Sequence, residues 1–549
     1  MTHAIVLNDV AYYKHPTPTR AAGGHVIASA LRDSGYECTV IDWFTLLDEE
    51  LFDTIKSLAT EDTKLLAISA TFLAPKESTG YNAISEATGL GAFRLPVSKK
   101  IDEAVFEKNL YMWLETEERC KEWFGRLKEV LPDVTIVLGG ARISRVVSLL
   151  EKTNYYLDAY KDVDYFVLGE GERIITQIAD SIFKNTKPNF NIREIRGCKF
   201  LAELTQTADI PRIYHTKDAC ISPNEWLPLE ISRGCRFNCA FCNYEKNVYR
   251  KKDKKTLVDE LTRNYELFGT QGYNLTADCL TDSKQYVDIF CDALSSLYFS
   301  VDFSAYARVD LLWKYDDMFD QLLEVGFKAG WFGIETFNHD AGKAVRKGLH
   351  PDKVKEILKN IRYKADKHEG FWLLTCLIFG LPKETIQSLE NTLQWYSNQE
   401  IIDEVSVSVL DFAEFSENLE GITNYSDISI DPKKFGFTKL SFSPFFWEHG
   451  TMNITQATEL KDKFRDLMAE HSYTRFGGGA TFEYPAIRSL GFTHKQTTQL
   501  LKNKFVVGKN LVNIDKKTKK RANEALLDMS KKRLQDYYKN LLTTERTVV

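Results

Sequence analysis

The chain has 549 residues, of which 44% are hydrophobic and 27% charged, and its net charge is −6. This composition excludes a disordered protein, and the length allows three to four domains. The negative charge argues against a nucleic-acid partner. No apolar run approaches the roughly 18 residues that a membrane span needs, and no signal peptide is evident, so we expect no membrane partner.

Residues 1–195 alternate between apolar strands and amphipathic helices, which predicts a doubly wound, Rossmann-like α/β domain. Strand Leu65–Thr71 is continuously apolar, as in a sheet buried on both faces. Two later strands run into glycine turns at 139–140 and 169–171. Residues 74–131 are too long for a simple crossover and predict an insertion. Ligands of such domains bind beyond the carboxyl ends of the strands, although a Gly-Gly turn can also be purely structural.

After a linker at 196–224, the alternation restarts and runs from about 225 to 415. Six strand–helix units predict a partial (β/α)6 barrel, because a closed barrel of this type needs eight. The expected strands are Leu227–Ser232, Gly272–Ala277, Phe299–Tyr306, Gly330–Ile334, Phe371–Phe379 and Val405–Leu410. Residues 416–549 predict a mainly helical C-terminal domain, which we expect to close the mouth of the barrel.

Ten cysteines in a chain of this length are too few for a disulfide scaffold and indicate a reducing, cytoplasmic location. Three of them, Cys235, Cys239 and Cys242, form a C-x3-C-x2-C motif directly after the first expected barrel strand. Zinc sites usually pair such a motif with a second, distant pair of ligands, and the sequence has no second pair. Three thiolates on a short loop suit a [4Fe–4S] cluster that has one open iron. An unrelated zinc loop or a chance spacing are the alternatives.

With Phe241 as the aromatic residue before its last cysteine, this motif resembles that of the radical SAM superfamily, and the resemblance covers about residues 225–415. It implies that the open iron binds S-adenosylmethionine (SAM) and that the reduced cluster cleaves SAM to a 5′-deoxyadenosyl radical. Segments after the other strands match in order, and the resemblance implies SAM contacts from Asp278, Arg308, Glu335, Ile378 and Gly380. Cys376 stands where the pattern often has glycine. Each buried Arg or Glu could instead form a structural ion pair.

An α/β domain placed before such a barrel resembles the cobalamin-binding subgroup of this superfamily. The resemblance implies cobalamin between the two domains, contacted by strand-end residues. We expect these to be Ser69, Thr71, Gly139, Gly140, Gly169 and Glu170. The sequence has no D-x-H-x-x-G motif, so a cobalt ligated by histidine is not expected. A domain that keeps the fold and has lost the cofactor is the alternative.

The expected function is therefore C–H activation by a radical SAM enzyme with a [4Fe–4S] cluster, SAM and cobalamin, leading to methylation of an unidentified substrate. The alternatives are radical oxidation, cyclisation, ring contraction or C–C bond formation without methyl transfer, and a non-catalytic iron–sulfur protein that transfers electrons. The enzyme interpretations imply a low-potential electron donor of the flavodoxin or ferredoxin type.

Overall fold

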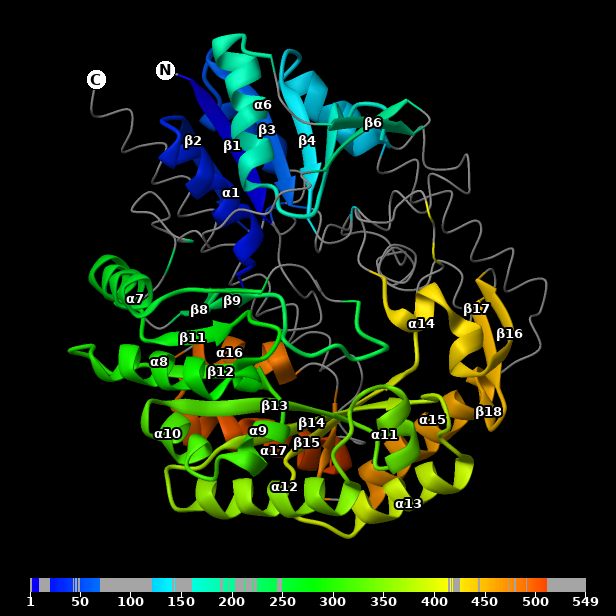
Figure 1. Cartoon of the computed structure of the whole chain (residues 1–549). Coiled ribbons are helices and arrows are strands. Elements are labelled where there is room, and N and C mark those ends of the chain that lie inside the picture. Colours follow the sequence, from blue (N-terminus) through cyan, green and yellow to red (C-terminus); the bar gives the residue numbers. More distant parts are fainter. Residues whose placement is uncertain are drawn as a thin grey trace.

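The structure of the protein is a computed structural model. It describes residues 2–8, 20–42, 44, 47, 50–69, 121–140, 143, 160–187, 191–195, 197–202, 213, 221, 225–243, 249–412, 415, 417, 425–442, 445–471, 473–477, 480–489 and 491–510. Within these ranges the chain forms two seven-stranded sheets, a small three-stranded sheet and a two-stranded one. Figure 1 shows the first sheet, in blue and cyan, above the second, whose early strands are green. The predicted insertion at 74–131 lies outside the described residues up to residue 120.

The first sheet has the strand order β2-β1-β3-β4-β5-β7-β6, and all neighbours are parallel except β6 and β7. Helices α1 and α6 cover one face, and α2 with the helical residues 121–130 covers the other. The strand order reverses between β1 and β3, which confirms the predicted doubly wound α/β fold. The elements are β1 (His3–Asn8), α1 (Ala22–Asp33), β2 (Glu37–Asp42), α2 (Glu50–Leu58), β3 (Thr63–Ser69), β4 (Thr135–Gly139), β5 (Tyr165–Leu168), α6 (Glu172–Lys184), β6 (Asn191–Ile195) and β7 (Cys198–Ala202).

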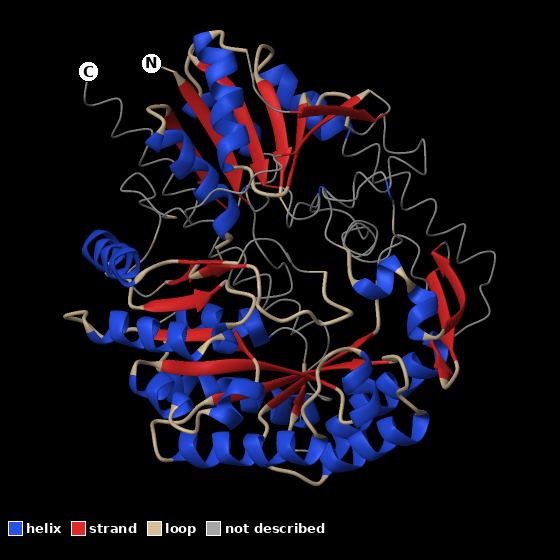
Figure 2. Cartoon of the chain, in the orientation of Figure 1, coloured by secondary structure: helices blue, strands red, loops and turns tan. Residues whose placement is uncertain are grey.

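The second sheet is a parallel, partial barrel with the order β19-β15-β14-β13-β12-β11-β8. Its strands are β8 (Trp226–Leu229), β11 (Gly272–Leu275), β12 (Asp302–Ala307), β13 (Phe327–Glu335), β14 (Trp372–Phe379), β15 (Glu404–Val409) and β19 (Arg475–Phe476). Helices line its outer side, as Figure 2 shows: α7 (Lys254–Phe268), α8 (Lys284–Ser295), α10 (Met318–Glu324), α12 (Pro351–Asp366) and α13 (Ile386–Ser397). The six predicted strands are present, and β19 adds a seventh that the sequence did not reveal.

Short elements connect these units. They are β9 (Ser232–Arg233), β10 (Arg250–Lys251), the 3-10 helix Leu280–Asp282, α9 (Asp310–Lys314), α11 (His339–Ala344), α14 (Asp427–Ile430) and the 3-10 helix Pro432–Phe435. Local chemistry sets several boundaries. The Asp253 side chain caps the start of α7, and Gly269 ends that helix in the left-handed conformation. Thr385 and Ser388 form a capping box at the start of α13.

The C-terminal region contains a small sheet as well as helices: β16 (Phe437–Phe442), β17 (Phe445–His449) and β18 (Met452–Asn453), then α15 (Ile454–His471), α16 (Ala480–Ser489) and α17 (His494–Asn510). Tyr484 of α16 packs edge-on against Trp226, the first residue of β8. Arg488 pairs with Asp302, the first residue of β12, over 2.7 Å. Helix α16 therefore packs where the barrel strands begin. The expectation that the C-terminal domain closes the mouth is wrong for α16, because the mouth lies where the strands end, whereas Trp447 and His449 of β17 contact Gly380 at that end.

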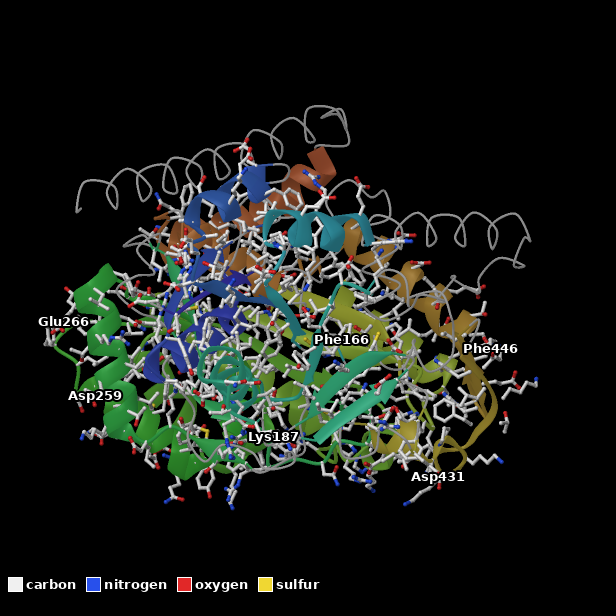
Figure 3. All side chains as sticks on the ribbon, turned by 90° about the horizontal axis from the view of Figure 1, so that it is seen from above. Phe166, Lys187, Asp259, Glu266, Asp431 and Phe446 are labelled. Atoms are coloured by element: carbon white, nitrogen blue, oxygen red, sulfur yellow. The ribbon has the colours of Figure 1, made fainter. Side chains whose placement is uncertain are left out.

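Figure 3 looks down on the molecule from the side of the first sheet. Phe166, in β5, lies near the middle of this view, and Asp259 and Glu266 of α7 lie at its edge. Among the helices in the described ranges, none combines the length and apolarity required to cross a membrane.

Candidate functional site

The three motif cysteines lie on the loop that follows β9 at the carboxyl end of the first barrel strands. Cys239 is buried, and Cys235 and Cys242 are partly exposed. The loop is held by two distant segments: the Ala240 amide donates to the Val345 carbonyl over 3.1 Å, and the Ile428 amide donates to the Ala240 carbonyl over 3.0 Å. The loop conformation thus depends on residues that follow β13 and β15.

Arg308 follows β12 and reaches this loop. Its Nη1 donates to the Sγ of Cys239 over 3.0 Å, and its Nε donates to Asp310 over 2.8 Å. The guanidinium also stacks on the Phe237 ring, 3.7 Å from the centroid. The Thr281 hydroxyl accepts from the Arg308 amide and donates to its carbonyl. Burial acts to raise the pKa of Asp310, but the hydrogen bonds and charge of Arg308 outweigh it and lower that pKa.

Glu335 ends β13 as a buried carboxyl group whose φ is +67°, a conformation that is strained for a residue with a side chain. Lys347 lies 3.5 Å from its Oε1 and donates to the Gly333 carbonyl over 2.6 Å. A Cβ at Gly333 would stand 2.5 Å from the Glu335 carboxylate, so glycine leaves room for that group. Burial raises the pKa of Glu335 against the opposing charge of Lys347.

Gly380 follows β14 with a φ of +90°, and a Cβ there would lie 2.2 Å from the Trp447 ring. His449 donates from Nε2 to the Gly380 carbonyl over 3.2 Å. The Glu384 carboxylate accepts from the Gly380 amide over 2.8 Å and from the Thr336 hydroxyl over 2.5 Å. Burial raises the pKa of Glu384 to about 7, although these donors act to lower it. Ile378, two residues earlier, is half-buried.

Asp278 and Cys279 follow β11 beside the loop. Asp278 is half-buried, and Cys279 is buried. A hydrogen bond with the Cys279 thiol lowers the pKa of Cys235 to about 7. Phe241 packs, partly buried, against the barrel core.

The donor set on this loop fits an iron–sulfur cluster, because three thiols lie within eight residues and a guanidinium contacts one of them. Within the described ranges, no three His, Cys, Asp or Glu side chains are grouped closely enough to hold a metal ion. The fit therefore rests on the identity of the donors and on Arg308, and the thiols do not form a compact ligand set in this conformation.

The residues expected to contact cobalamin occupy the carboxyl edge of the first sheet. Ser69 ends β3 and is paired in register with Gly139, which ends β4. Gly140 and Gly169 have φ values of +113° and +73°, which favour glycine. Thr71 lies outside the described residues. Glu170, in contrast, forms ion pairs with Arg233 and Arg250 of the barrel region, over 2.9 Å for Arg233.

Four further side chains, from Lys347, Glu384, Trp447 and His449, lie at the ends of β13 and β14. Sequence reasoning placed these residues in or near the expected barrel mouth without a specific contact, but it missed a buried network at the carboxyl ends of β1 and β2. There Asp42 accepts hydrogen bonds from Arg20, Asn8 and His25, and Arg20 pairs with Glu225 over 2.7 Å. Burial acts to raise the pKa of Asp42, but the charges of Arg20 and His25 lower it well below its usual range. The acidic Asp42 at a strand end was the one sequence signal for this network.

Comparisons with known proteins agree with this geometry. The model of the radical SAM superfamily matches residues 229–396. An uncharacterised methyltransferase of Pyrococcus horikoshii is 22% identical over 296 residues, a match that covers 50% of this chain and 60% of that protein. The chain spans 58–60% of the length of the curated relatives that it matches.

Two solved structures share the whole architecture. The radical SAM methyltransferase TsrM from Kitasatospora setae, with cobalamin and a [4Fe–4S] cluster bound, has a TM-score of 0.59 and 12% identity and covers 92% of this chain and 99% of its own. The cobalamin-dependent SAM radical enzyme OxsB, with aqua-cobalamin and SAM bound, has a TM-score of 0.58 and 13% identity and covers 100% of this chain and 79% of its own. Residues 229–396 thus match the radical SAM superfamily, and the chain shares its fold with two cobalamin-binding radical SAM enzymes.

Proposed function

We propose that the chain is a radical SAM enzyme that binds a [4Fe–4S] cluster through Cys235, Cys239 and Cys242 and catalyses cobalamin-dependent methylation. The observation that carries the proposal is the cysteine loop at the carboxyl ends of the barrel strands, with Arg308 hydrogen-bonded to Cys239. When bound, the cluster supplies the electron that cleaves SAM to a 5′-deoxyadenosyl radical, and cobalamin supplies the methyl group.

The barrel residues would hold SAM by their charges and backbone groups. Arg308 is always protonated and presents a planar fork, which suits a carboxylate. Its hydrogen bond to Cys239 would place that carboxylate beside the cluster. Glu335, with Lys347 beside it, offers a carboxylate to a cationic or hydroxyl group. Gly380 and Ile378 would line the adenine side, where the absent side chain of Gly380 keeps the Trp447 ring close. Asp278 and Phe241 would complete the cradle.

For cobalamin, the strand-end residues of the first sheet remain candidates, with one revision. Ser69, Gly139, Gly140 and Gly169 would border the cofactor, because they end adjacent strands or turn directly after them. Glu170 is engaged by two arginines of the barrel region and is no longer proposed as a cofactor ligand. The electron donor proposed is a protein of the flavodoxin or ferredoxin type.

A second candidate is radical chemistry without methyl transfer, which the fold shared with OxsB, a cobalamin-dependent SAM radical enzyme, equally allows. The two candidates differ in the fate of SAM. Methylation through cobalamin consumes a second SAM and releases S-adenosylhomocysteine, whereas the alternative releases only 5′-deoxyadenosine and methionine. Reconstituted, reduced protein with added cobalamin and SAM should yield both nucleoside products. Formation of 5′-deoxyadenosine alone would favour the second candidate.

The prediction that tests the enzyme itself is Cys239→Ala. We expect this variant to lose the cluster absorbance and all SAM cleavage, because two thiolates cannot hold the cluster with one open iron. Iron content, visible absorbance and 5′-deoxyadenosine formation measure the effect. Cys291→Ala, which removes a buried thiol from α8, is the matched control and should behave like the wild type. Cluster binding or SAM cleavage by Cys239→Ala would refute the assignment.

A further inference from the structure

Arg233 joins the first sheet to the barrel. This residue ends β9, two positions before Cys235, and its guanidinium contacts three carboxylates. Nη1 lies 2.9 Å from Glu170, Nη2 lies 2.5 Å from Glu172, and Nε lies 2.8 Å from Glu230. Glu170 lies in the turn that follows β5 and Glu172 begins α6, whereas Glu230 and Arg233 belong to the barrel region. We call this group, with Arg250, the carboxylate latch.

Arg250 reinforces the latch from β10, which pairs antiparallel with β9. Its Nη1 donates to Glu170 Oε2 over 3.1 Å, and its Nη2 also donates to Glu170. Arg233, Arg250 and Glu170 are each exposed by only 8–12% in their side chains. Charges that are this buried are stable only when they are paired, so separating the two sheets would leave unpaired charges on both sides.

A second connection, residues 425–428, lies at the other end of the cysteine loop. The Tyr425 ring is buried in the core of the first sheet, and Ile428, three residues later, is buried in the barrel core. Between them, the Ser426 amide donates to Asn243 Oδ1 over 2.9 Å, and Asp427 pairs with Arg346. We call this segment the strap. Because Ile428 also donates to Ala240, the strap binds the loop directly.

The cysteine loop is thus attached to the first sheet at both ends, at its start through Arg233 and at its end through the strap. We propose that Arg233 and the strap are positioning elements, which keep the strand ends of the first sheet in register with the cysteine loop and transmit ligand binding at that sheet to the loop. The ligand and the cluster in this statement rest on the proposed function, whereas the attachment of the loop does not. Neither element is a catalytic residue.

Hydrogen–deuterium exchange of the full chain without cobalamin tests the attachment. The variant is Glu170→Gln/Glu172→Gln, which keeps side-chain volume and removes two charges from the latch. We expect exchange of the amides in 234–243 to rise about tenfold or more, because charge-assisted hydrogen bonds that hold the loop are lost. The matched control is Glu483→Gln, which breaks the comparably buried pair with Arg475 (2.6 Å) where the barrel strands begin.

The control should leave exchange in 234–243 unchanged. Equal exchange of the loop in the wild type and the latch variant would overturn the proposal, and so would an equal rise in the control. Tyr425→Leu is a second, independent variant, which we expect to raise exchange in 239–243 more than in the 250–251 hairpin. A rise confined to the first sheet in that variant would remove the strap from the proposal.

Hydroxocobalamin then tests the transmission. In the wild type we expect its addition to slow exchange both at the edge of the first sheet and in 234–243. The latch variant should bind hydroxocobalamin within about threefold of the wild-type affinity and lose only the slowing in 234–243. If the variant keeps that slowing, the latch does not transmit binding. If the wild type binds no hydroxocobalamin, the cobalamin proposal fails, and the exchange measured without it still decides whether the latch holds the loop.

Discussion

At the residue scale, two charged side chains of the barrel mouth each contact more than one group. Arg308 contacts a loop cysteine and Asp310, and Lys347 contacts the residues at the end of β13. Such sharing lets one side chain fix the position of a second. It also means that a substitution can alter both ligand binding and local structure, so a test has to separate the two effects.

Arg308→Ala makes that separation. We expect the dissociation constant for SAM to rise about ten- to a hundredfold, since a charge-assisted hydrogen bond contributes roughly 1.5–3 kcal/mol. We expect the cluster to assemble still, because the three thiolates are untouched. Titration of the reconstituted variant with SAM measures the first effect, and visible absorbance measures the second. Arg488→Ala, at the opposite end of the barrel, is the control. Unchanged SAM affinity, or loss of the cluster, would show that Arg308 has only a structural role.

The sequence located residues of this site where a motif carried them, but it could not supply their partners. Arg308 and Gly380 directly follow a barrel strand and Glu335 ends one, as expected from the order of the strands. Their contacts with Cys239, Lys347 and Trp447 depend on how loops fold back over the strand ends. For Glu170 the sequence predicted the wrong partner. Its place in a glycine-rich turn suggested a contact with a ligand, but the Glu170 carboxylate pairs with two arginines that lie 63 and 80 positions later in the chain.

At the element scale, long apolar strands were predictable, and short or covered ones were not. Strand β14 is eight residues of nearly unbroken apolar sequence, which leaves few other structures open to it. Strand β19 has two residues and exists because it pairs with β15. The position of α16 could not be predicted either. Its Tyr484 packs in one cluster with Trp226, Trp331 and Trp372, but these strands are apolar on both faces, so the sequence does not show which face a helix covers.

The turn after β14 yields a prediction at this scale. Gly380→Ala should lower the free energy of unfolding by about 1–3 kcal/mol or more, because a methyl group would collide with the Trp447 ring and the positive φ disfavours a side chain. Chemical denaturation measures the loss. Gly348→Ala is the control, since a Cβ there meets no atom within 4 Å. Equal stability of the two variants would mean that β17 moves away easily and does not shape the turn.

At the scale of the whole molecule, separate sets of contacts join the two sheets: the carboxylate latch, the strap, and the pair between Arg20 and Glu225. The latch and the Arg20–Glu225 pair are ionic, and the strap combines apolar packing with hydrogen bonds. Such directional contacts fix the position of one sheet relative to the other. At the beginning of the barrel strands, α16, α17 and β19 bury several ionisable groups, and burying such groups costs free energy. One of these, Glu404, makes the stability of the molecule depend on pH.

Glu404 begins β15 and is fully buried, with its Oε2 accepting from the Trp372 indole over 3.2 Å and Arg475 at 3.9 Å. Burial raises the pKa of Glu404 from 4.5 to about 7, and the charge of Arg475 only partly opposes this. Between these two values the folded chain holds a proton that the unfolded chain has released. The stability that this proton provides is therefore complete below about pH 4.5 and is lost as the pH rises to about 7.

Glu404→Gln should remove this dependence, because the amide keeps a group that accepts from Trp372 and cannot ionise. We expect the wild type to lose more free energy of unfolding than the variant when the pH rises from 5 to 8, as measured by urea denaturation at both pH values. His494, whose pKa burial lowers to about 4, contributes a slope of the opposite sign. That slope is present in both proteins and cancels in the comparison. Identical pH dependence in the two proteins would mean that Glu404 stays ionised in the fold and that Arg475 neutralises it.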